Sequence, residues 1–175
     1  MERAGSIMGG RFLSSIVPVA LGILGVFIAN FPVSVLGGLV PPPLLVFMPL
    51  YFWGMVRPDL MTPAWVFVLG ILQDLLSGGP PGVWAASFLG AYFLIDRQRD
   101  MLAGLSGVGA IAGFAVSALA ACVTAYAIVT LYYWHFPPLA TMLVQLAMTV
   151  LFYIPAVFVL GIAHRRLVGP YRSDF

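Results

Sequence analysis

Charged residues are scarce in this chain of 175 residues, of which only 8% are Asp, Glu, Lys or Arg. Soluble domains carry about 25%, so the chain lacks the polar surface that a water-soluble fold of this size needs. Hydrophobic residues make up 62% of the chain, and the mean hydropathy is +1.05. This composition predicts a single integral membrane domain over residues 1–175, in contact with the lipid bilayer and with no nucleic-acid partner.

Residues that carry catalysis or bind metals are also few. The one cysteine, Cys122, excludes an intrachain disulfide and a cysteine-based metal site, and its apolar surroundings favour a packing role. The two histidines, His135 and His164, lie in different parts of the chain. No nucleophile elbow, Walker loop or dinucleotide-binding pattern is present. We therefore expect no catalytic residues, no metal and no cofactor.

Breaks in the apolar pattern divide the chain into six segments. Each is expected to be helical, because backbone groups in hydrocarbon must be hydrogen-bonded within the segment. Their approximate bounds are 12–30, 40–56, 62–77, 81–95, 103–134 and 138–163. The second is expected to be short and kinked, since Pro41–Pro43 begins it and Pro49 lies within it. The predicted fold class is all-α, a polytopic membrane bundle of six transmembrane helices, some short or kinked, with room for a small cavity.

The basic residues predict the orientation of this bundle. With six crossings, every arginine falls on one side of the membrane, while the three connections on the other side contain no charged residue. The positive-inside rule then places both termini in the cytoplasm, and the first segment is retained because no cleavage pattern follows it. Tryptophans and tyrosines favour the interfaces, so we expect Trp53 and Trp65 at the inner one and Trp84 and Tyr132–Trp134 at the outer one. The arginines are Arg3, Arg11, Arg57, Arg97, Arg99, Arg165, Arg166 and Arg172.

Small side chains recur at every fourth position of the fifth segment. Such a stripe lets two helices approach closely in lipid. It predicts either a packing seam within this chain or a docking groove for a partner's transmembrane helix. The stripe consists of Gly109, Gly113, Ser117, Ala121 and Ala125.

Two clusters of mixed charge lie in the predicted inner loops, Arg57-Pro58-Asp59 and Asp96–Asp100. Exposed ion pairs of this kind stabilise a fold little. The clusters are therefore either solvated loop ends or a cytoplasmic surface that contacts a partner.

Asp74 is an acid within an apolar segment. An acid at the centre of a spanning helix costs roughly 2.5 to 3.5 kcal/mol, although Asp74 lies only about 5 Å below Ser77 at the outer mouth. Its position near the end of its own helix is also unfavourable for a negative charge. Three partners could offset these costs: the backbone N–H groups that start the next segment, His135, or a donor on another protein. The N–H groups are those of Gly82, Val83 and Trp84. A proton or cation pathway is the remaining option.

Several of these residues occur together in a characteristic order: Arg57-Pro58-Asp59, Pro63, Phe67, Gly70, Gln73-Asp74, Ser77-Gly78 and Gly82, followed by a second apolar segment. This order closely resembles the central motif of the MreD family, the rod shape-determining membrane proteins of bacteria. The motif covers about residues 57–95, and the rest of the chain resembles the family in size and hydropathy.

The resemblance implies a non-enzymatic scaffold subunit of the bacterial cell elongation complex, located in the inner membrane. Such a subunit binds MreC, a single-span protein with a periplasmic domain. Through MreC it works with MreB, RodA and a class B penicillin-binding transpeptidase in lateral peptidoglycan synthesis and rod cell shape. A fold similar to the substrate-binding subunits of energy-coupling-factor transporters is also implied.

The residues expected to form the partner-binding or structural motif are Arg57, Pro58, Asp59, Gly70, Asp74, Gly78, Gly82 and Trp84. Two alternative functions stay open at this point. One is the substrate-binding subunit of a small-solute (vitamin) transporter. The other is a membrane enzyme that acts on a lipid-linked substrate.

Overall fold

The computed structural model describes the backbone of residues 2–31, 41–103 and 108–168. It also describes the side chains of residues 16–31, 41–97, 99 and 108–168. Within these ranges the regular structure is helical and no strand occurs, as the sequence predicts. The elements are α1 (Glu2–Ala29), α2 (Phe47–Val56), α3 (Pro63–Ser77), α4 (Val83–Ala103), α5 (Val108–Tyr133), α6 (Leu139–Ala163) and the π-helical turn η2 (His164–Val168).

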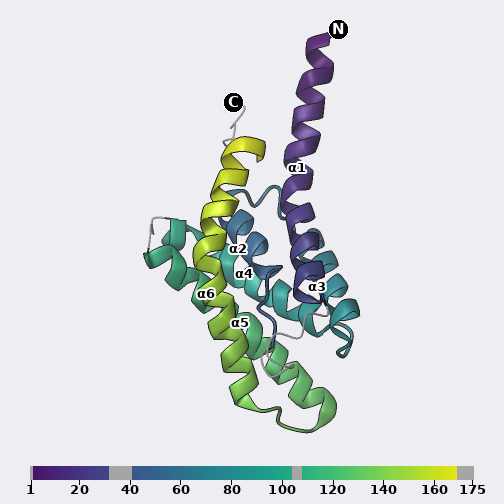
Figure 1. Ribbon diagram of the computed structural model, residues 1–175, viewed down its shortest axis with the longest axis vertical. Coiled ribbons are helices and arrows are strands. Elements are labelled where there is room, and N and C mark those ends of the chain that lie inside the picture. Colours follow the sequence, from purple (N-terminus) through teal and green to yellow (C-terminus); the bar gives the residue numbers. More distant parts are fainter. Residues whose placement is uncertain (1, 32–40, 104–107, 169–175) are drawn as a thin grey trace.

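The two ends of the helical bundle differ in what they contain. The start of α1 and the end of α6 lie at one end, the upper end of Figure 1, while the turn between α5 and α6 lies at the other. The π-helical turn η2 packs against α1 at the upper end. Helix α2 packs between α1, α4 and α6, which places this short helix inside the bundle.

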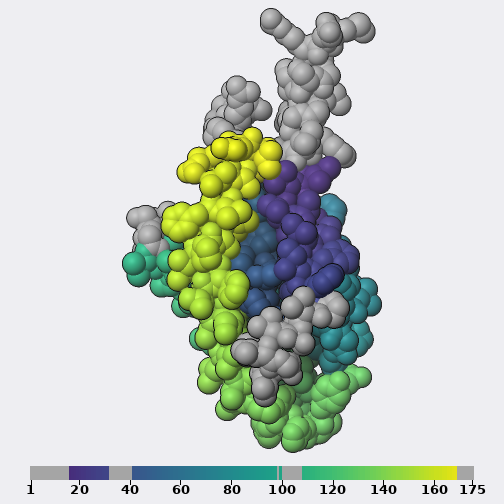
Figure 2. Space-filling view, viewed as in Figure 1, coloured from purple at the N-terminus to yellow at the C-terminus, as the bar shows by residue number. Residues whose placement is uncertain are grey.

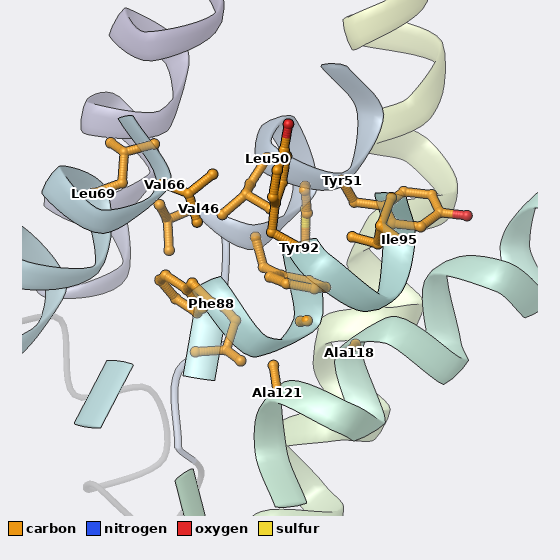
Figure 3. Close-up of a cluster of buried hydrophobic side chains, with 14 of the residues drawn as sticks. Val46, Leu50, Tyr51, Val66, Leu69, Phe88, Tyr92, Ile95, Ala118 and Ala121 are labelled. Atoms are coloured by element: carbon orange, nitrogen blue, oxygen red, sulfur yellow. The ribbon is translucent and has the colours of Figure 1, made fainter. Parts of the chain in front are cut away.

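Helix α4 is the central element, since it packs against α2, α3 and α5. Phe88 of α4 is fully buried, with Val66 of α3 and Leu50 of α2 on one side and Ala118 and Ala121 of α5 on the other (Figure 3). Large apolar side chains of α2, α3 and α4 thus face small side chains of α5. The contrast in size lets α5 pack closely against α4.

Aromatic rings join α2, α5 and α6. The rings of Phe114 and Tyr153 are stacked, with centroids 3.7 Å apart. Tyr51 contacts both of them edge-on, at centroid distances of 5.3 Å and 5.9 Å. Edge-to-face pairs are a favourable arrangement of aromatic rings, so the two contacts of Tyr51 hold α2 against α5 and α6.

Two helices among the described residues are long and apolar enough to cross a membrane, Val108–Tyr133 and Leu139–Val168. At about 1.5 Å per residue, α5 is about 39 Å long, more than the ~30 Å of a bilayer's hydrocarbon core. Helix α6 forms one flank of the molecule in Figure 2. Its exposed side chains are largely apolar and include Leu139, Leu143, Val144, Leu151, Phe152, Phe158 and Val159.

The sequence prediction for the second segment is wrong at its start. Helix α2 begins at Phe47 rather than at residue 40, and residues 41–44 are not helical. The reason is tertiary, because the N–H of Leu44 donates to the hydroxyl of Thr149 on α6 at 3.0 Å instead of to a helical carbonyl. Pro49 lies in the first turn of α2, where a missing N–H is tolerated. The helix is short, with 10 residues, as predicted.

Two other boundaries also differ from the prediction, and a third lies outside the described residues. Helix α1 begins at Glu2 instead of residue 12, and α4 extends to Ala103 instead of ending at residue 95. With 21 residues, α4 is therefore not a short helix. Helix α5 begins at Val108, and residues 104–107, which the prediction includes, lie outside the described residues. Hydropathy locates the apolar part of a helix, and the backbone continues in the same conformation into polar sequence.

Two predictions about side-chain position need correction as a result. The charged cluster Asp96–Asp100 lies on the last turns of α4 instead of in a loop, and Arg99 pairs with Asp96 at 2.6 Å. Trp53 is fully buried in the core, so it is not an interface residue. Trp65 and Trp134 are exposed, at 45% and 93% of their surface.

Candidate functional site: the α3–α4 corner

Helix α3 ends and α4 begins within a few residues, because two glycines adopt backbone conformations that other residues avoid. Gly78 follows the last residue of α3 with a φ of +68°, in the left-handed conformation that commonly ends a helix. Gly82 has a φ of +94° and comes directly before α4. A side chain at either position would be strained. The chain therefore reverses direction sharply, and the start of α4 lies beside the end of α3.

The carboxylate of Asp74 holds this corner. The residue is 3% exposed, and its oxygens accept hydrogen bonds from three backbone N–H groups at the start of α4. Oδ2 accepts from Gly82 at 2.9 Å and from Ala85 at 3.2 Å, and Oδ1 accepts from Trp84 at 2.8 Å. The first N–H groups of a helix have no intrahelical partner and favour a negative charge. Asp74 thus caps α4 from the neighbouring helix.

Of the partners that the sequence suggests for Asp74, the geometry shows the internal cap. Gly82 and Trp84 are both donors, as predicted, and Ala85 donates where Val83 was expected. Since α4 begins at Val83, Trp84 and Ala85 are its second and third residues, and a capping oxygen accepts from these two positions. His135 is exposed in the turn between α5 and α6 and is not among these donors.

Gly70 brings the two helices close enough for this cap. It is buried on α3, one helical turn before Asp74 and on the same face. A Cβ atom added at Gly70 would lie 2.4 Å from the Cα and 2.8 Å from the nitrogen of Ala85. The backbones of α3 and α4 are therefore in contact here, and the absence of a side chain lets the carboxylate reach the N–H groups.

Gln73 extends the hydrogen-bonded site toward α1. Its side chain is buried, and its Oε1 accepts a hydrogen bond from Nδ2 of Asn30 at 3.2 Å. The Asn30 amide also donates to the carbonyl of Val26 at 2.8 Å. Asn30 and Thr149 are polar anchors that the sequence analysis did not identify. Each is a single polar residue in or beside an apolar segment, and that is the signal that could have revealed them.

The Arg57-Pro58-Asp59 part of the motif lies elsewhere. Nε of Arg57 donates to Oδ1 of Asp59 at 2.9 Å, and Nη2 donates to Oδ2 at 2.8 Å. This hydrogen bond holds the pKa of the Asp59 carboxyl below its ordinary value of 3.8, against a smaller opposing effect of burial. Helix α3, about 22 Å long at 15 residues, separates this loop from the corner. The fold therefore does not bring the two halves of the motif together.

The stripe of small residues on α5 is a packing seam within the chain. Gly113, Ser117, Ala121 and Ala125 are buried, and Gly109 is half-buried. The Ser117 hydroxyl donates to the Gly113 carbonyl at 2.9 Å, so its polar group is satisfied within α5. This burial within the chain favours the packing seam over a docking groove for a partner helix.

A cavity of about 200 Å³ lies beside the corner, between it and helices α5 and α6. Its walls are mostly apolar, and the short, interrupted helices of the sequence analysis favour such a space. The lining residues are Asp74, Gly79, Pro80, Val83, Trp84, Cys122, Ala125, Tyr126, Val129, Pro137, Pro138, Thr141, Met142 and Gln145.

Comparison with known proteins adds no family to this description. No family model, no curated protein and no solved structure matches the chain. Among the side chains that the structure describes, no group of three His, Cys, Asp or Glu residues could hold a metal ion. The corner's chemistry is that of a carboxylate used to join two helices.

Proposed function

We propose that this chain is a non-enzymatic scaffold subunit of the bacterial cell elongation complex, of the MreD type. The observation that carries the proposal is that four motif residues build the same α3–α4 corner. The two helices approach closely at Gly70, and Asp74 caps the start of α4. The turn between the helices depends on Gly78 and Gly82. A motif that resembles a family's central motif, and whose members depend on one another in this way, supports a shared fold.

Membrane placement is the second part of the proposal. The chain crosses the inner membrane six times with both termini in the cytoplasm, and its fold is similar to the substrate-binding subunits of energy-coupling-factor transporters. The grouping of the helix ends supports this, since the start of α1 and the end of α6 lie toward the same end of the bundle (Figure 1). Helix α2 and the irregular residues before it are short of a full crossing, but Leu44, Val46 and Phe47 are buried in the bundle. Irregular backbone is tolerated at membrane depth when protein surrounds it.

In this role the chain binds MreC directly and supports MreB, RodA and a class B penicillin-binding transpeptidase through it. Two surfaces are available for partners. The outer one is the corner with its exposed Leu75, Pro81 and Ala86. The inner one combines the Arg57–Asp59 loop with the charged end of α4.

Transport of a small solute is the second candidate, and the cavity favours it. Its volume of about 200 Å³ is below the ~300 to 1,000 Å³ of typical ligand pockets. Few polar groups line it, whereas a vitamin site needs several convergent ones. The scaffold therefore accounts better for the same residues.

Affinity purification of the tagged chain from native membranes tests the proposal. The scaffold predicts recovery of a single-span protein with a coiled-coil periplasmic domain, and loss of that protein when Leu75 on the corner is replaced by Arg. Val108→Arg on the distant start of α5 is the control, since this residue is at least as exposed as Leu75. Recovery of ATPase subunits in place of the single-span protein would support transport and contradict the scaffold.

A further inference from the structure

The cavity beside the corner has walls from three parts of the fold. Helix α5 contributes Cys122 and Val129, helix α6 contributes Met142, and the corner contributes Trp84. Both α5 and α6 are long and apolar enough to cross a membrane. Half of the cavity therefore belongs to helices whose natural surroundings are acyl chains.

Polar groups on the walls are directed at the protein instead of the cavity. The carboxylate of Asp74 accepts its three backbone hydrogen bonds, and the hydroxyl of Tyr126 donates to the carbonyl of Pro137 at 3.0 Å. The amide of Gln145 donates to the carbonyl of Pro42 at 3.2 Å. Thr141, the remaining polar side chain, belongs to an exposed residue. A polar ligand would find few free hydrogen-bond partners here, whereas a hydrocarbon group needs none.

The size of the cavity fits a hydrocarbon group. An engineered apolar cavity of about 150 Å³ stays dry and takes up benzene, and this cavity measures about 200 Å³. That space suits a short run of methylene groups better than a whole drug-sized ligand. The cavity is partly open at the surface, so an apolar group from outside the chain can enter it.

We propose that this cavity holds a short run of methylene groups from the acyl chain of a membrane lipid. The exposed apolar surface of α6 continues up to the cavity wall, since exposed Leu139 lies about one helical turn before the lining residue Met142, on the same side of the helix. Acyl chains are the apolar molecules that surround such a surface in a bilayer. The inference requires that α5 and α6 cross the membrane, and it is independent of which protein partners the chain binds.

Photolabelling of the full-length chain tests the proposal. The purified chain is placed in phosphatidylcholine nanodiscs whose lipid carries a diazirine midway along the acyl chain, and labelled residues are mapped by mass spectrometry. The expected result is labelling of Cys122 and Val129 on the cavity wall, in addition to Leu151 and Phe158 on the exposed flank of α6. Filling the cavity with Met142→Trp should lower labelling of Cys122 and Val129 at least fivefold.

The controls separate this proposal from its competitors. Leu143→Trp adds the same ring outside the cavity and should leave wall labelling unchanged. Labelling of Leu151 and Phe158 without the wall in the unsubstituted chain would overturn the proposal while leaving the membrane placement intact. Reaction of Cys122, the chain's one cysteine, with a water-soluble maleimide would show a wet cavity and would also overturn it. The proposal would also be overturned if the wall residues were labelled in nanodiscs but not in native membranes, because a partner's side chain would then be the natural occupant.

Discussion

The carboxylate of Asp74 lies in surroundings that disfavour a charge, and its hydrogen bonds offset the free-energy cost of burying it there. An acid in an apolar segment costs roughly 2.5 to 3.5 kcal/mol at mid-membrane. Each hydrogen bond to a charged group contributes about 1.5 to 3 kcal/mol, and Asp74 accepts three. The gain therefore exceeds the cost, and all three donors are backbone N–H groups.

Removing this carboxylate should destabilise the fold. In Asp74→Ala the three N–H groups of α4 lose their acceptor, and a buried unpaired donor costs about 1 to 3 kcal/mol. We expect a loss of at least about 2 kcal/mol, seen as a lower midpoint of thermal unfolding in detergent. Asp74→Asn keeps one acceptor oxygen and should lose less. Unchanged unfolding of both variants, together with lost partner binding, would contradict the cap and favour a contact with another protein.

The pH dependence of the Asp59 pair follows from its direction of shift. The Arg57 hydrogen bond lowers the folded pKa of Asp59 below its ordinary value of 3.8. The stability that the pair contributes is therefore complete above the ordinary value and is lost as the pH falls from there through the lower folded value. We expect a fall in the unfolding temperature over this acid range that is absent in Asp59→Asn. The fall should be small, because the carboxylate is 39% exposed. Identical acid profiles for the two proteins would contradict this.

At the scale of helices, the contact between α3 and α4 depends on Gly70. Its substitution by Ala places a methyl group 2.4 Å from the Cα of Ala85, which forces the helices apart and stretches the Asp74 cap. Overpacking of this kind costs about 1 to 3 kcal/mol. Thermal unfolding of Gly70→Ala should show a loss in that range.

Gly90→Ala is the matched control for this prediction. Gly90 lies on the exposed face of α4, and an added Cβ would have no atom within 4 Å. Ala is favoured over Gly in a helix by up to about 1 kcal/mol, so this variant should be as stable as the original or slightly more. Equal loss in both variants would show that the close approach at Gly70 is unimportant.

Some helix bounds could be predicted from the sequence, and the reason is local chemistry. Helix α3 was expected at 62–77 and spans Pro63–Ser77, because a proline favours its first position and Gly78 ends it. The start of helix α2 could not be predicted, since it depends on a bond between Leu44 and Thr149, 105 residues apart. The end of α4 was missed because Asp96 and Arg99 pair along the helix, which hydropathy does not register.

The candidate site was predictable to a similar extent. Asp74 and its donors follow from an acid placed next to a helix start, so Gly82 and Trp84 could be named from the sequence. The role of Gly70 could not, because only the positions of α3 and α4 in space reveal the contact with Ala85. The buried position of Trp53 likewise depends on how α2 packs inside the bundle.

At the scale of the whole molecule, both proposals depend on how the bundle lies in the membrane. In the proposed placement, the corner and the turn between α5 and α6 lie at the outer surface, and the Arg57–Asp59 loop lies at the inner surface. The proposed contact with MreC and the proposed lipid in the cavity both require the bundle to cross the bilayer. An inverted or partly inserted chain would supply neither.

Cysteine accessibility in intact cells tests this placement most directly. In a Cys122→Ser background, single cysteines replace Ser77, His135 or Asp59, all of which are exposed. A membrane-impermeant maleimide should label Ser77→Cys and His135→Cys from outside, whereas Asp59→Cys should be labelled only after the cells are permeabilised. Labelling of Asp59→Cys in intact cells, or protection of either outer position until permeabilisation, would contradict the six-crossing scaffold.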